Sequence, residues 1–429
     1  MGALDLTNLP RLHARRVHAY AASFTDELVN ELISSYTNEN EVCLDPFSGA
    51  ATSLIQARLL NRSAIGIDID PVACLIARVV TTPYSTKEID EIYKKVTKQL
   101  DEIKVVLENL FHNNRSNIAI HSFSLNGVNI SIPQDDNMGY WFAPTQRALL
   151  AALVHVSNNV DIPKQKDVID LSISSAIVHK WPYTLSHARD IDHSRPHRVL
   201  RDDLSVNSQI QIFYRALGNI FRTLRKLNKL TADYNVDMKV IEGDSAEVLT
   251  KLEPASVHYV ITSPPYFNAI DYPRAHKFSQ WWLWPQRDQL TGQMYIGLKP
   301  GDTSKYLVRF ISNLVPENAK SLALLEEISK PTYIALCQYI NDLNSIINGI
   351  ARVLKPGRNL SFILANNTIK GVEVPVVDIV TELLKGKRFH SLSVEKRSIM
   401  HNRRRYPFGI RGFKGLMESE YIVNAISAT

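Results

Sequence analysis

Short apolar segments on either side of a helical pattern mark the N-terminal part of the chain. Runs of apolar residues at 42–44 and 64–69 predict two buried strands, and the pattern at 52–60 predicts a helix between them. Two short apolar strands joined by a helix form a βαβ unit, which implies a parallel sheet covered by helices on both faces. The expected fold class is therefore α/β.

From residue 85 the strand pattern gives way to a helical one. The residues SerThrLysGlu at 85–88 form a capping box, and apolar residues then recur every three or four positions from Tyr93 to Leu110. This apolar face suits either packing within its own domain or a dimerising coiled coil. Further helices are expected at 145–158, 167–179 and 209–229. We therefore expect residues 85–235 to form an inserted, mainly helical domain.

Strand patterns resume after the insertion. Five more strands are expected, at 238–242, 257–262, 360–365, 391–395 and 421–425. Helices are expected between them at 333–354 and 376–384. Together with the two early strands, these elements predict one seven-stranded, doubly wound, Rossmann-like sheet in a domain formed by 1–84 and 236–429.

Composition narrows the class of protein without identifying it. The 429 residues are 45% hydrophobic and 21% charged, which excludes wholesale disorder, and the formal charge of +6 is a mild basic excess. The three cysteines form no CxxC pair, so neither a disulfide framework nor a structural zinc site is expected. Without an apolar signal core or a run of eighteen apolar residues, the protein is expected to be soluble and cytoplasmic, with no membrane partner.

Candidate chemistry lies in the loops that follow the strands, because open α/β sheets bind ligands beyond the carboxyl ends of their strands. In the first loop, at 45–53, Gly49 allows close backbone approach, but the loop lacks the GxGxxG pattern of dinucleotide sites. After the second strand, Asp68 is the better placed acid to accept ribose hydroxyls. Asp70 is the reserve, and it equally suits capping a helix that starts at Pro71.

The most informative loop reads ThrSerProProTyrPhe, at 262–267. Two consecutive prolines lock φ and lack N–H groups, so the carbonyls before and between them become fixed acceptors. Tyr266 follows immediately as a ring that can stack. Rigid acceptors beside a stackable ring suit a planar group that carries an amino function.

These motifs together resemble the S-adenosylmethionine-dependent amino-methyltransferases of DNA, which methylate cytosine N4 or adenine N6. The resemblance rests on AspProPheSerGly, GlyIleAsp, GlyAspSer and ThrSerProProTyr, and covers about residues 12–80 and 236–425. The stretch 262–279 is similar to the cytosine-N4 type of prokaryotic restriction-modification systems. HisAlaTyrAlaAlaSerPheThr, at 18–25, is similar to the family's N-terminal cofactor motif.

The resemblance implies a role for each matching residue. S-adenosylmethionine is the implied cofactor, and its site would comprise Tyr20, Phe24, Thr25, Asp45, Phe47, Gly49, Thr52, Asp68, Asp244 and Ser245. Asp68 would hold the ribose, and Asp244 with Ser245 would meet the adenine. The implied catalytic residues are Ser263, Pro264, Pro265 and Tyr266: Ser263 and the Pro264 carbonyl would accept from the target amino group while Tyr266 stacks on its ring. Ala51 departs from the family, which usually has a second glycine there.

Such chemistry requires a flipped base and a grip on double-stranded DNA. Basic residues concentrate at 385–414, where Arg403, Arg404 and Arg405 are the expected phosphate contacts and a solvated surface is the alternative. No ProCys motif is present, which argues against C5 methylation, because that reaction needs a thiolate nucleophile.

Several questions stay open at the level of sequence. The cluster around His187, His193 and His197 suits DNA contact or an exposed loop better than a metal, and no metal site is expected. The run Trp281, Trp282 and Trp284 favours buried core over a stacking platform. Adenine N6, RNA and a non-catalytic binding role are the alternatives to cytosine N4. A cognate restriction endonuclease would act separately.

Overall fold

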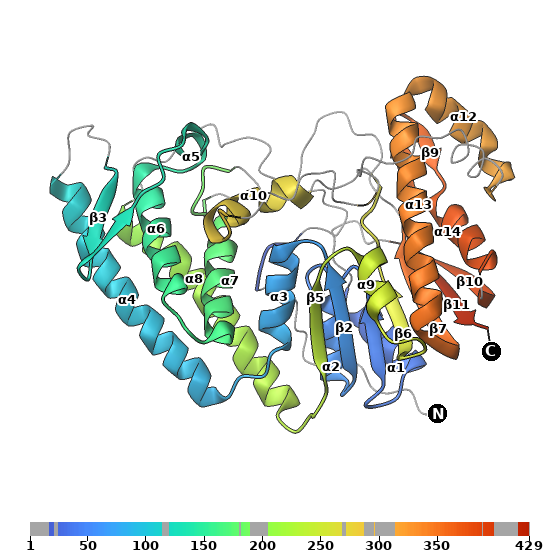
Figure 1. The fold of residues 1–429 in the computed structure, drawn as a ribbon, viewed down its shortest axis with the longest axis horizontal. Coiled ribbons are helices and arrows are strands. Elements are labelled where there is room, and N and C mark those ends of the chain that lie inside the picture. Colours follow the sequence, from blue (N-terminus) through green and yellow to red (C-terminus); the bar gives the residue numbers. More distant parts are fainter. Residues whose placement is uncertain are drawn as a thin grey trace.

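A computed structural model provides the fold of the chain (Figure 1). It describes residues 17–20, 25–113, 120–179, 182–188, 205–267, 272–286, 296, 314–387, 389–398 and 419–428. Phe24, His193, His197, Arg403, Arg404 and Arg405 lie outside the described residues.

Seven strands form one mixed sheet in the order β10-β11-β7-β6-β1-β2-β5. The strands are β1 (Val42–Asp45), β2 (Ser63–Asp68), β5 (Met238–Glu242), β6 (Val257–Thr262), β7 (Leu354–Leu364), β10 (Phe389–Ser398) and β11 (Ser419–Ser427). Neighbouring strands from β5 to β7 run parallel, whereas β11 runs antiparallel to both β7 and β10. The predicted α/β fold with a seven-stranded sheet is confirmed.

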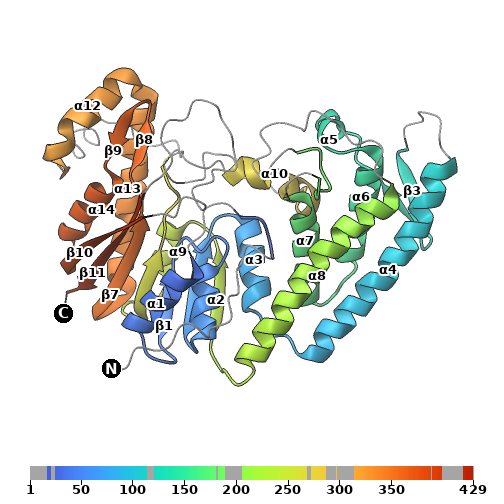
Figure 2. The same cartoon turned by 180° about the vertical axis from the view of Figure 1, so that it is seen from behind.

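Helices cover both faces of this sheet, as Figures 1 and 2 show from opposite sides. One face packs against α1 (Asp26–Tyr36), α2 (Thr52–Leu59) and α3 (Pro71–Thr81), and the other against α9 (Ser245–Lys251), α13 (Lys330–Val353) and α14 (Val376–Lys385). Alternation along the strands explains this: Tyr259 and Ile261 of β6 enter the first core, whereas Val260 enters the second. The sheet is therefore doubly wound.

A mainly helical arm lies beside the sheet, between β2 and β5 in the chain (Figure 2). It contains α4 (Thr86–Asn113), β3 (Ser122–Leu125), β4 (Val128–Ser131), α5 (Asp136–Trp141), α6 (Pro144–Asn158), α7 (Pro163–Ile177) and α8 (Val206–Thr231). The apolar face of α4 is buried within the chain, where Ile92, Val96, Leu100, Ile103 and Leu107 join the first core. That seam packs inside its own chain, so it does not form the exposed seam that a dimerising coiled coil requires.

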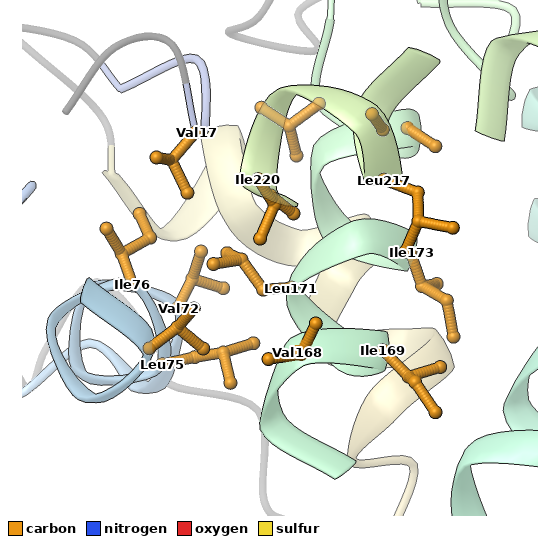
Figure 3. Close-up of a cluster of buried hydrophobic side chains, with 14 of the residues drawn as sticks. Val17, Val72, Leu75, Ile76, Val168, Ile169, Leu171, Ile173, Leu217 and Ile220 are labelled. Atoms are coloured by element: carbon orange, nitrogen blue, oxygen red, sulfur yellow. The ribbon is translucent and has the colours of Figure 1, made fainter. Parts of the chain in front are cut away.

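The arm and the sheet domain share a continuous hydrophobic core. Figure 3 shows Val72 and Leu75 of α3 facing Val168 and Leu171 of α7, with Ile220 of α8 closing the cluster. Arg78 of α3 adds a hydrogen-bonded ion pair with Asp167, at 2.9 Å. The arm is thereby fixed against α3, the helix that follows the second strand.

The remaining elements follow β6 and β7. They are α10 (Tyr272–Leu283), the 3₁₀ turn η4 (Pro316–Asn318), α12 (Ala319–Ile328), β8 (Asn367–Ile369) and β9 (Val372–Val374). In both views α10 and the β8–β9 hairpin lie on the side of the sheet where β2 passes into α3 (Figures 1 and 2). Among the described helices, none has the length and apolar character needed to cross a membrane.

Candidate active site

The carboxyl ends of four neighbouring strands meet at one edge of the sheet. Asp45 ends β1, Asp68 ends β2, Glu242 ends β5 and Thr262 ends β6. From β1 the chain winds outward through β2 to β5, and it then returns to the other side of β1 as β6. The reversal lies between β1 and β6, and in doubly wound sheets such a switch point is where ligands bind.

Asp45 joins the two strands at this switch point. Its carboxylate accepts hydrogen bonds from the Thr262 hydroxyl at 2.7 Å, from the Phe47 backbone N–H at 3.0 Å and from the Ser53 hydroxyl. The side chain is only 1% exposed, and this burial raises the pKa of Asp45 to about 6 despite the three donors. Asp45 therefore organises the first loop and fastens it to the residue before Ser263.

The turn after Asp45 requires a glycine at its centre. Gly49 has a φ of +44°, and a Cβ there would lie 3.3 Å from Cε1 of the Tyr20 ring. Ala51 also adopts a left-handed φ, +62°, as the N-cap residue of α2. The Ser48 hydroxyl is buried and, among the described residues, has no hydrogen-bond partner. Thr52 is buried in the first turn of α2, and Phe47 packs at the edge of the second core.

Asp68 connects the loops that follow β1 and β2. Its two carboxylate oxygens accept from the backbone N–H groups of Gly49, at 2.8 Å, and Asp70, at 2.9 Å. Burial, followed by the charge of Asp70, raises the pKa of Asp68 to about 7. Asp70 caps α3 through the Val72 N–H at 2.8 Å, which confirms the capping interpretation.

The third loop is bonded to the first. Asp244 caps α9 by accepting from the Ala246 N–H at 2.9 Å, and the buried Ser245 hydroxyl donates to the Pro46 carbonyl. The Gly243 N–H donates to the backbone carbonyl of Asp68 at 2.8 Å. The loops after β1, β2 and β5 thus form one hydrogen-bonded unit.

The target loop, residues Ser263 to Tyr266, continues directly from β6. Pro264 is buried, whereas Ser263, Pro265 and Tyr266 are half-buried. The Tyr339 hydroxyl of α13 donates to the Pro265 carbonyl at 3.0 Å. The Asn367 side-chain amide donates to the Phe267 carbonyl. Tyr339 and Asn367 were not predicted from the sequence, since neither belongs to a recognisable motif.

The N-terminal segment forms another wall of this edge. The Tyr20 ring packs against Tyr272 and His276 of α10, with centroids 5.6 and 5.2 Å apart. His276 Nδ1 lies 2.5 Å from Asp70 Oδ2. The His18 ring lies beside the His276 ring, with centroids 6.0 Å apart. Burial lowers the pKa of His18 to about 3, so the His18 imidazole is neutral. Thr25 caps α1 by accepting from the Leu28 N–H at 3.4 Å.

The chain is similar to known DNA methylases along nearly all of its length. Residues 5–79 match the family model of the N6/N4 DNA methylases. The type II methyltransferase M.MvaI of Kocuria varians is 21% identical over 92% of this chain and 86% of its own length. M.BsoBI of Geobacillus stearothermophilus is 21% identical over 87% and 78%. M.MjaII of Methanocaldococcus jannaschii is 33% identical, but over 23% of this chain and 18% of its own.

The chain resembles the N6/N4 DNA methylases, through the family model at residues 5–79 and through type II relatives along most of its length.

Similarity to this family implies S-adenosylmethionine as the methyl donor, and the chemistry of the residues at this edge of the sheet fits it. The absence of a side chain at Gly49 lets its backbone approach the Tyr20 ring, which a Cβ would meet at 3.3 Å, and the buried Ser48 hydroxyl lacks a partner among the described residues. Asp68 supplies carboxylate oxygens at the strand end where ribose hydroxyls are held in Rossmann-like folds.

The structure also tests the predictions for the tryptophans, the histidine cluster and the cysteines. Trp282 is 4% exposed, and Trp281 and Trp284 pack against the first core, which confirms the core interpretation. His187 is buried, and no group of His, Cys, Asp or Glu within the described residues has the arrangement of a metal site. All three cysteines are buried thiols.

Proposed function

We propose that this DNA methylase is a type II enzyme that methylates the exocyclic N4 of a cytosine flipped out of duplex DNA. One observation carries the proposal: the Thr262–Asp45 hydrogen bond, 2.7 Å long, fastens the target loop to the Gly49 turn at the switch point of the sheet. The type II relatives support the class of enzyme.

The cofactor side of the site would be formed by the loops around Gly49, Asp68 and Asp244. S-adenosylmethionine, when bound, would supply an electrophilic methyl group on a sulfonium centre. Tyr20 would cover the Gly49 turn, against which its ring already lies, and Asp68 would accept from the ribose hydroxyls. Phe47, Thr52 and Ser245 line the same loops, with Phe24 and Thr25 assigned to the N-terminal wall by motif alone.

The target side would be formed by Ser263, the two prolines and Tyr266. The lone pair of a nucleobase amino group is delocalised into the ring, so acceptors on its protons must raise its nucleophilicity. The Pro264 carbonyl and Ser263 would be those acceptors, and Tyr266 would stack on the ring to offset part of the cost of flipping. The amino nitrogen would attack the donated methyl group directly, with the methyl–sulfur bond breaking to leave a thioether and the nitrogen losing one proton, so no cysteine would be needed.

DNA would be held by parts of the chain on either side of this edge. We assign target recognition to the helical arm and phosphate contact to Arg403, Arg404 and Arg405, because ionic contacts to the backbone dominate DNA affinity. The enzyme would act in the cytoplasm of a prokaryote, beside a separate restriction endonuclease.

Nucleoside analysis tests the target base. Unmethylated plasmid DNA is incubated with the protein and labelled S-adenosylmethionine, digested to nucleosides and separated by mass spectrometry. We expect N4-methylcytosine. N6-methyladenine as the sole product would overturn the choice of base, and label appearing only in RNA would overturn the DNA substrate.

A further inference from the structure

Two side chains from distant elements hold the segment around the target loop. Tyr339 donates its hydroxyl to the Pro265 carbonyl, and Asn367, the first residue of β8, donates its amide to the Phe267 carbonyl. The Phe267 and Tyr339 rings also pack together, with centroids 5.5 Å apart. The donors lie 74 and 100 residues beyond their acceptors in the sequence, so the loop is restrained by tertiary contacts.

These bonds engage the Pro265 and Phe267 carbonyls and leave another carbonyl of the loop without a protein donor. Within the described part of the chain, no group donates to the Pro264 carbonyl, which directly precedes the engaged Pro265 carbonyl. Pro265 has no N–H, so the peptide bond between the prolines contributes only an acceptor. The carbonyl available to a ligand is therefore fixed in direction by its anchored neighbour.

The Tyr339 hydroxyl is suited to act as a permanent donor. Tyr339 is 2% exposed, and burial raises its pKa, with the nearby Tyr266 adding to the shift. The phenol consequently stays protonated throughout the neutral range. Among the described residues no other group donates to the Pro265 carbonyl, so removing the hydroxyl would leave that carbonyl without its protein partner.

We propose that Tyr339 and Asn367 are positioning residues that aim the Pro264 carbonyl at the amino group of the target base. This inference rests on the proposed function. The two residues touch the loop rather than the substrate, so they would act on the rate of methyl transfer and leave cofactor binding unchanged.

Comparing Tyr339 with a second buried tyrosine, Tyr84, distinguishes a positioning role from a general contribution to stability. Tyr84 is also buried, at 4% exposure, and its hydroxyl also donates to a backbone carbonyl, that of Lys164 at 3.2 Å. It lies between α3 and α4, away from the loop. Tyr84→Phe therefore removes the same chemical group as Tyr339→Phe, with the same ring retained.

The experiment measures single-turnover methyl transfer to unmethylated plasmid DNA, the dissociation constant of S-adenosylmethionine and urea unfolding for each variant. We expect Tyr339→Phe to lower the transfer rate constant about 10- to 100-fold, since small misplacements of reacting groups have effects of that order. Its cofactor affinity should stay within about twofold of wild type. Asn367→Ala should lower the rate in the same way, and Tyr84→Phe should leave it unchanged.

Three results would overturn the assignment. The first is Tyr339→Phe and Asn367→Ala with wild-type transfer rates. The second is an equal loss of rate in Tyr84→Phe, and the third is loss of cofactor affinity in step with loss of rate. A wild-type protein that binds the cofactor but methylates no DNA would instead overturn the proposed function itself.

Discussion

Replacing Asp68 by asparagine tests the cofactor side of the site, because the change removes a charge while keeping the shape. The two carboxylate oxygens each accept a backbone N–H, from Gly49 and Asp70. An amide offers one acceptor and turns an NH₂ towards the other N–H. Hydrogen bonds to charged groups contribute about 1.5–3 kcal/mol each, so Asp68→Asn should weaken S-adenosylmethionine binding roughly 10- to 100-fold.

The same substitution should leave the apoprotein at least as stable as wild type at pH 8. A native pKa of about 7 against an unfolded value of 3.8 means that the native state binds more protons between these values. Stability of the wild-type apoprotein therefore falls as pH rises from about 4 to about 7. The full shift corresponds to about 4 kcal/mol. Because the Asp68 side chain is only half-buried, the destabilisation of the wild-type apoprotein at pH 8 should be smaller than this value. The asparagine variant avoids that destabilisation, which offsets its loss of one hydrogen bond.

Calorimetric titration of S-adenosylmethionine and urea unfolding at several pH values measure both effects. Glu247→Gln is the control, since Glu247 is an exposed acid in the first turn of α9. Cofactor affinity of the wild-type protein should rise with pH through the pKa of Asp68, and the rise should disappear in Asp68→Asn. Unchanged affinity, or a loss of affinity that follows a loss of stability, would refute the role of the carboxylate.

Three other substitutions probe the turn, the shared core and the DNA contact. Gly49→Ala places a methyl group 3.3 Å from the Tyr20 ring at a φ of +44°, so it should cost about 1–2 kcal/mol in urea unfolding and weaken cofactor binding; wild-type values for both would show that the turn tolerates a side chain. Leu171→Ala empties a fully buried position between α3 and α8, and urea unfolding should show a loss of about 2–5 kcal/mol; a loss below about 1 kcal/mol would mean that the arm is not fixed there. Changing Arg403, Arg404 and Arg405 together to Ala should weaken binding to all DNA sequences alike and flatten its salt dependence in fluorescence titrations; an unchanged salt slope would exclude these arginines from the interface.

The strands of the sheet were predictable because parallel strands buried on both faces are short and continuously apolar. The predicted ranges for β5 and β6 agree with the observed Met238–Glu242 and Val257–Thr262. β7 instead begins at Leu354, earlier than the predicted strand at 360–365. Leu354 continues the apolar pattern of the preceding helix, so it was assigned to that helix. The hairpins β3–β4 and β8–β9 were missed, because three- or four-residue strands carry too few positions to show a period.

The sequence predicted where the acidic residues of the site lie, but not which groups donate hydrogen bonds to them. Asp45 and Asp68 follow apolar strands, so their placement at one edge follows from a parallel sheet. Which donors each carboxylate accepts depends on how the loops fold back, and sequence spacing does not encode that. The contact of Tyr339 was even less predictable. Its helix was expected, but its hydrogen bond to Pro265 joins residues 74 positions apart and depends on which face of α13 meets the loop.

The sheet itself sets the distance between the two halves of the site. Leu44 of β1 pairs with Val260 of β6, so the first loop and the target loop leave the sheet from adjacent, register-locked positions. Asp45 and Thr262 then bond across that gap, and neither residue lies in a flexible turn. Because strand register moves far less than loops do, we expect the approach of a target amino group to the proposed cofactor loop to be fixed before either ligand binds. The hydrogen bonds from Tyr339 and Asn367 also restrain the residues that follow the end of β6, because they hold the Pro265 and Phe267 carbonyls. Disturbing any one of these contacts should therefore affect the rate of transfer more than the binding of either ligand.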